Sequence, residues 1–63
     1  MLQICLTPAM IIFRTPTSEH QEMLKERYQA ERNVKGDLFI KSSPQQLYKI
    51  LLELSYEYDM EIF

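Results

Sequence analysis

The chain has 63 residues, of which 46% are hydrophobic and 25% charged, and its net charge at pH 7 is −2. These proportions are normal for a folded domain and argue against intrinsic disorder, which requires low hydrophobicity and a large net charge. One cysteine and one histidine exclude an internal disulfide and a structural zinc site of the usual Cys/His kind. We therefore expect a single small domain over residues 1–63 that is stabilised by association with another chain.

Residues 1–13 carry no charged side chain. Leu2, Ile4 and Leu6 alternate with polar or small residues, which predicts a half-buried strand. The apolar run after Pro8 is either a second strand or a continuation of the first. Because no glycine or asparagine is present for a tight hairpin turn, we favour one kinked strand. The segment is too short to span a bilayer and lacks the basic start of an export signal, so we expect no membrane association and a cytoplasmic location.

A turn over residues 14–18 precedes a predicted helix over 19–33. Ser18 and Gln21 have the spacing of a capping box, in which each side chain bonds a free backbone amide at the start of a helix. Few positions along this helix are apolar, so we expect most of its surface to face water.

Gly36 is the only glycine, and it suits either the left-handed position after a helix end or a tight turn. Residues 38–40 are apolar and predict a short strand. Ser43 as N-cap, followed by Pro44 at the first helical position, predicts the start of a second helix that runs to about Tyr56.

This second helix has two apolar stripes, whereas a surface helix of a small domain usually has one. The stripe expected to face the core consists of Leu47, Ile50, Leu51, Leu54 and Tyr58. The other stripe recurs every four residues and consists of Tyr48, Leu52 and Tyr56. It either packs within the chain or forms an interface. We favour an interface with a second copy, most simply in a two-fold dimer, because the first helix offers little apolar surface in return.

Residues 58–62 alternate between apolar and acidic side chains and predict a final strand. The predicted order along the chain is β-α-β-α-β. It indicates an α/β or α+β fold with a small three-stranded sheet covered by two helices. The two edges of such a sheet would also favour association with another chain.

No catalytic, metal-binding or nucleotide-binding motif is present, and we expect neither enzymatic activity nor a cofactor. His20 has no second histidine with which to build a metal site, and we interpret it as a surface residue. Cys5 lies in an uncharged segment without a basic neighbour to activate it, and we interpret it as a small buried residue. An enzyme whose active site assembles between subunits would have only these two groups and the carboxylates to use.

Two groups of charged residues remain as candidate binding sites. The acidic group is either a solvated face or a patch that docks on a basic protein surface; it consists of Glu53, Glu57, Asp59 and Glu61. The basic group would serve an alternative function, that of a nucleic-acid-associated regulator; it consists of Arg27, Arg32, Lys35 and Lys41. Interleaved acidic residues and the negative net charge argue against nucleic-acid binding.

The favoured hypothesis is a small non-enzymatic interaction module that self-associates and regulates or inhibits a larger, unidentified protein by occupying its surface. Its small size is compatible with an inhibitor encoded by a phage or a bacterium. The residue pattern identifies no family.

Overall fold

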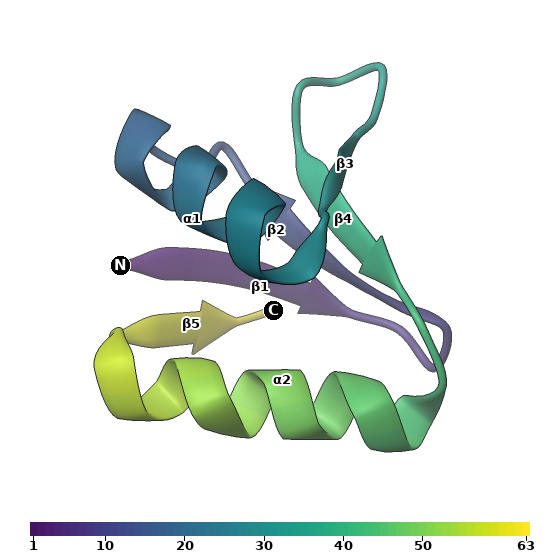
Figure 1. The fold of residues 1–63 in the computed structure, drawn as a ribbon. Helices are drawn as coiled ribbons and strands as arrows, with labels where there is room; N and C mark the ends of the chain where they lie inside the picture. Colours follow the sequence, from purple (N-terminus) through teal and green to yellow (C-terminus); the bar gives the residue numbers. More distant parts are fainter.

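The computed structural model describes all 63 residues and has two helices packed on a mixed sheet (Figure 1). In chain order the elements are β1 (Leu2–Leu6), β2 (Met10–Arg14), α1 (Ser18–Tyr28), β3 (Glu31–Arg32), β4 (Leu38–Lys41), α2 (Pro44–Glu57) and β5 (Met60–Ile62). The fold is α+β, which confirms the predicted class in its coarser form. The predicted three-stranded sheet is wrong, because the sheet has five strands in the order β3-β4-β2-β1-β5.

One additional strand comes from the N-terminal segment. β1 and β2 are separate antiparallel strands, with Leu6 opposite Ile11, so the favoured kinked strand is wrong. The backbone amide of Thr7 donates to the carbonyl of Met10 at 3.0 Å. The hydroxyl of Thr7 accepts hydrogen bonds from the amides of Ala9 and Met10. A threonine hydroxyl therefore stabilises this turn, which contains no residue with positive φ and needs neither glycine nor asparagine.

Helix α1 is shorter than the predicted helix over 19–33. Its N-cap is Thr17, whose side chain accepts the amide of His20, so the predicted cap at Ser18 is displaced by one residue. The helix ends at Tyr28 because Gln29 adopts a left-handed conformation with φ 53° and ψ 42°. The chain then reverses and enters β3.

The remaining additional strand, β3, pairs with β4 in a hairpin. Gly36 has a φ of 88° in the connecting turn, a value in the left-handed region that favours glycine. The side-chain oxygen of Asn33 accepts the amides of Lys35 and Asp37. Of the two roles that the sequence allowed for Gly36, the turn is confirmed. β3 was not predicted because its two residues are both charged and exposed and show no apolar alternation.

Both helices cover the same face of the sheet, and the chain crosses that face twice. α1 connects β2 to β3, and α2 connects β4 to β5; in each case the two connected strands run in the same direction. One core joins the sheet to both helices and consists of Leu2, Ile4, Ile11, Phe13, Leu24, Ala30, Leu38, Ile40, Leu47, Ile50 and Leu54. The other face of the sheet carries no helix, and we call it the helix-free face.

Candidate interaction surface

The candidate surface is built on α2, whose start is fixed by strong local signals. The side chain of Ser43 accepts the amide of Gln46 at 3.3 Å, and Pro44 occupies the first turn, as predicted. These two features satisfy one free amide and remove the need to satisfy another. The predicted core stripe is buried at Leu47, Ile50 and Leu54, and it is half-buried at Leu51 and Tyr58.

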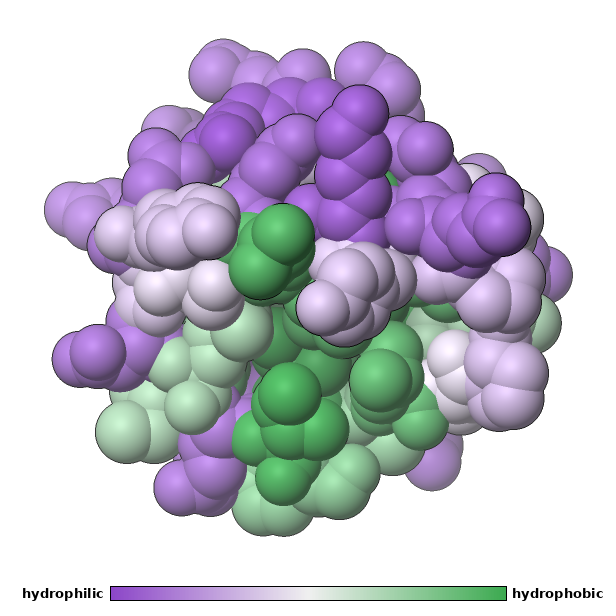
Figure 2. All heavy atoms as spheres, turned by 90° about the horizontal axis from the view of Figure 1, so that it is seen from below, coloured by the Kyte–Doolittle hydropathy of each residue, from purple (hydrophilic) through white to green (hydrophobic).

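The second stripe of α2 is exposed. The exposed fractions are 69% for Tyr48, 45% for Leu52 and 80% for Tyr56, so the stripe does not pack within the chain. We call these three residues the α2 ridge. Figure 2 looks onto the outer side of α2 and shows hydrophobic and intermediate side chains gathered in its middle and lower part, with hydrophilic ones above. The role of the ridge as an interface stays a prediction.

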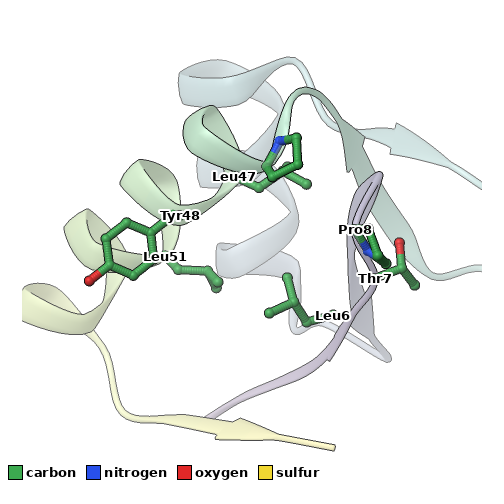
Figure 3. Close-up of a pocket in the computed structure, with 7 residues that line it drawn as sticks. Leu6, Thr7, Pro8, Leu47, Tyr48 and Leu51 are labelled. Carbon is green, nitrogen blue, oxygen red and sulfur yellow. The ribbon is translucent and has the colours of Figure 1, made fainter.

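An apolar pocket lies beside the ridge, between the first turns of α2 and the β1–β2 turn (Figure 3). It has a volume of about 390 Å³. Leu6 and Leu51 point toward one another across it, and Tyr48 stands at its rim. The rest of the lining consists of Thr7, Pro8, Pro44 and Leu47, so no lining residue is charged.

The pocket exists because the helices leave one corner of the sheet uncovered. Leu6 lies opposite the buried Ile11, and Ile62 lies opposite the buried Ile4, so both side chains point to the helix-bearing face. Both nevertheless remain about half exposed, at 44% for Leu6 and 53% for Ile62. The apolar surface therefore includes sheet residues that the fold's own helices do not cover.

Two of the predicted acidic docking residues contact α1. Arg27 donates to Glu57 at 2.7 Å, and the hydroxyl of Tyr28 donates to Glu53 at 3.0 Å. The hydrogen bond to Glu57 raises the pKa of the Arg27 guanidinium. Burial, and then the hydrogen bond to Glu53, raise the pKa of the Tyr28 hydroxyl. These contacts hold the two helices side by side at the C-terminal end of α1.

The other two acidic residues lie elsewhere. Glu61 pairs with Gln3 in the sheet and shares the helix-free face with it, whereas Asp59 precedes β5 and its carbonyl accepts the amide of Leu2 at 2.9 Å. Two of the four carboxylates therefore bond α1, one lies on the helix-free face and one precedes β5, and their role as a docking patch stays a prediction. No group of histidine, cysteine, aspartate and glutamate side chains is placed to hold a metal ion.

The four basic residues are also dispersed over different elements. Arg27 on α1 bonds Glu57, and Arg32 on β3 donates to the side chain of Gln21 at 2.7 Å. The ammonium group of Lys41, at the end of β4, lies 5.8 Å from the ring centre of Phe39, and Lys35 belongs to the β3–β4 turn. The four residues therefore come from different elements, and their use in nucleic-acid binding stays an alternative prediction.

Neither His20 nor Cys5 has the surroundings of a reactive group. His20 is half-buried, not fully exposed, because its ring packs edge-on against Tyr58 with 5.3 Å between ring centres. Cys5 is half-buried on the helix-free face, opposite Ile12. Neither side chain makes a hydrogen bond to another titratable group.

Comparisons with protein-family models, with curated proteins and with solved structures found no match. Neither helix has the length and hydrophobicity that crossing a membrane requires. The pocket is the feature that sequence reasoning missed, since it depends on the β1–β2 turn, for which the sequence had favoured a kinked strand.

Proposed function

We propose that this protein is a non-enzymatic protein-interaction module that self-associates through the α2 ridge. The observation that carries the proposal is the exposure of Tyr48, Leu52 and Tyr56 beside an uncharged pocket. Exposed apolar patches of this kind, bordered by polar residues, mark interaction sites on small proteins. Tyrosine is suited to such a site because its ring is apolar and its hydroxyl can stay in contact with water.

Electrostatics supports the same assignment. Of the three charged side chains on α2, Glu53 and Glu57 are bonded to α1, which leaves Lys49 as the remaining charge of the helix. The three ridge residues are themselves uncharged, so a contact confined to them buries no unpaired charge.

We further propose that the assembled module regulates a larger protein by occupying its surface. Asp59 and Glu61 are both exposed and are available to dock on a basic partner surface, where charge speeds association. In this proposal the partner protein binds the same apolar surface that is used for self-association. It either replaces the second copy or binds beside it.

Sedimentation equilibrium at micromolar concentration tests self-association. We expect the wild-type chain to have about twice its mass of 7.6 kDa and Tyr56→Glu to sediment as a monomer, because a buried charge without a partner is strongly unfavourable. Tyr56 is 80% exposed, so this substitution should leave the monomer folded by circular dichroism.

Val34→Glu provides the matched control. Val34 is fully exposed in the β3–β4 turn, away from the ridge, and the same change of charge there should leave the dimer intact. A wild-type monomer, or a Tyr56→Glu variant that dimerises like the wild type, would contradict the proposal.

A further inference from the structure

We propose that a hollow on the helix-free face binds a small organic carboxylate, a ligand with one negative charge and an apolar body. The hollow has a volume of about 320 Å³ and shares no residue with the pocket beside α2. We call it the sheet hollow. Its lining consists of Cys5, Ile12 and Arg14 from the sheet and of residues 33–35 and 37 from the β3–β4 turn.

The β3–β4 turn forms one side of the sheet hollow and is held in place at several points. The side-chain oxygen of Asn33 accepts the amides of Lys35 and Asp37, and the amide of Asn33 donates to the carbonyl of Asp37 at 2.9 Å. The carboxylate of Asp37 accepts the amide of Thr15 at 3.1 Å, which joins the turn to the end of β2. This side of the hollow is therefore formed before a ligand binds, which lowers the cost of binding.

Two cations line the sheet hollow without a carboxylate partner. The structure has one ion pair, between Arg27 and Glu57, so neither Arg14 nor Lys35 is neutralised by a salt bridge. The guanidinium of Arg14 lies 5.6 Å from the ring centre of Phe63, and this contact offers its N–H groups no oxygen to bond. The hollow therefore presents positive charge together with free hydrogen-bond donors.

The balance of charge in the sheet hollow favours an anion. Asp37 is the one acidic lining residue, and its carboxylate already accepts a backbone amide. Two cations against one carboxylate give the lining a net charge of +1, whereas the whole chain carries −2. Glu31 and Glu61 also belong to the helix-free face but do not line the hollow.

The remaining lining suits an apolar body on the ligand. Cys5 lies opposite Ile12 on the neighbouring strand, and both side chains are half-buried. Val34 adds a fully exposed apolar side chain from the turn. An apolar group can cover these side chains while its carboxylate meets Arg14, whose fork of N–H donors matches two carboxylate oxygens. The volume is near the lower limit of ligand pockets, about 300 Å³, so the ligand is small.

The thiol of Cys5 provides a test of the positive charge, because it is the only cysteine and lines the hollow. Iodoacetate and iodoacetamide both form a sulfur–carbon bond with the thiolate and release iodide, but only iodoacetate carries a carboxylate. The ratio of their rates, divided by the same ratio for N-acetylcysteine, cancels the intrinsic reactivity of the thiol. We expect a normalised ratio of about three or more, because a positive hollow concentrates anions.

Matched variants assign this preference to the sheet hollow. Arg14→Gln removes one lining cation at an exposed position and should bring the normalised ratio close to that of N-acetylcysteine. Lys25→Gln makes the same change of net charge at an exposed position on α1 and should keep the wild-type ratio. A wild-type ratio equal to that of N-acetylcysteine, or an equal loss in both variants, would overturn the proposal.

Protection of Cys5 from iodoacetamide tests equilibrium binding, with phenylacetate as the probe. Phenylacetate should slow the alkylation to a saturating limit, and Arg14→Gln should raise its apparent dissociation constant at least about tenfold, since a charge-assisted bond is lost. Phenylacetamide lacks the charge, and acetate and inorganic phosphate lack the apolar body, so each should protect less at the same concentration. Equal protection by phenylacetamide would overturn the role of charge, and equal protection by phosphate would overturn that of the apolar body.

This inference is independent of the proposed self-association. The sheet hollow lies on the helix-free face, whereas the α2 ridge belongs to a helix on the other face. Tyr56→Glu should therefore bind phenylacetate like the wild type, and Arg14→Gln should sediment like the wild type. A chain that sediments as a monomer contradicts the proposed function alone, and a chain that phenylacetate does not protect contradicts this inference alone.

Discussion

The hydrogen bond of Tyr28 between the two helices makes the stability of the fold depend on pH. Its hydroxyl donates to Glu53, and its pKa lies above the ordinary value of 10.0 because of burial and this hydrogen bond. The folded state therefore favours the neutral phenol more than the unfolded chain does. The stability that results is fully present below the unfolded pKa of about 10 and is lost as the pH rises through the higher pKa of the folded state.

We expect Tyr28→Phe to lower the free energy of unfolding at pH 7 by about 0.5–1.5 kcal/mol, since it removes one hydrogen bond. The variant should also lose less of its stability than the wild type between about pH 9 and 11. Urea denaturation across this range measures both effects. Tyr56→Phe, at an exposed position without a hydrogen bond to Glu53, should keep the wild-type pH dependence. Equal slopes for Tyr28→Phe and the wild type would exclude the coupling.

At the scale of the element, α1 ends because Gln29 takes a left-handed conformation and its amide donates to the carbonyls of Leu24 and Lys25. That conformation costs a residue with a Cβ atom about 1–2 kcal/mol. Glycine avoids this cost and instead adds about 0.4–1 kcal/mol of chain entropy to the unfolded state. We therefore expect Gln29→Gly to raise the free energy of unfolding by up to about 1 kcal/mol, measured by urea denaturation. Gln29→Ala keeps the Cβ atom, and a glycine variant no more stable than it would contradict this account.

The sequence predicted α2 better than the end of α1 and the sheet, because the features that define α2 are local. The cap at Ser43, Pro44 and the apolar period of α2 are all local signals, and the structure confirms them. The end of α1 depends on a conformation that glutamine rarely adopts, and β3 is held by its pairing with β4. The β1–β2 turn depends on a side-chain hydrogen bond of Thr7. Neither pairing nor such a bond is visible as periodicity.

One part of the candidate site could be predicted from local sequence signals, and the other part could not. The ridge follows from the spacing of Tyr48, Leu52 and Tyr56 along one helix, so its separation from the core stripe could be predicted. The pocket requires Leu6 and Pro8 to lie beside α2, and these residues are brought there by the topology of the sheet. No segment of the sequence contains both halves of the pocket.

At the scale of the whole molecule, charge and apolar surface are separated. The paired charges, Arg27 and Glu57, join the helices, and the other basic residues are spread over β2, β3, β4, the β3–β4 turn and both helices. The ridge and pocket contribute no charged side chain to the proposed interface. Association through this surface should therefore depend on apolar burial, whereas nucleic-acid binding would depend on charge.

Salt separates these two kinds of association. Between about 0.1 M and 1 M salt the Debye length falls from about 10 to 3 Å, yet we expect the dimer dissociation constant from sedimentation to change by less than about twofold, because no ion pair crosses the interface. Binding of a fluorescent single-stranded oligonucleotide through the basic residues would weaken steeply over the same range, since each phosphate contact releases a counterion. Anisotropy should detect only weak oligonucleotide binding even at low salt. A dimer that dissociates as salt rises would instead place ion pairs in the contact, and tight, salt-sensitive oligonucleotide binding would favour the nucleic-acid function over the interaction module.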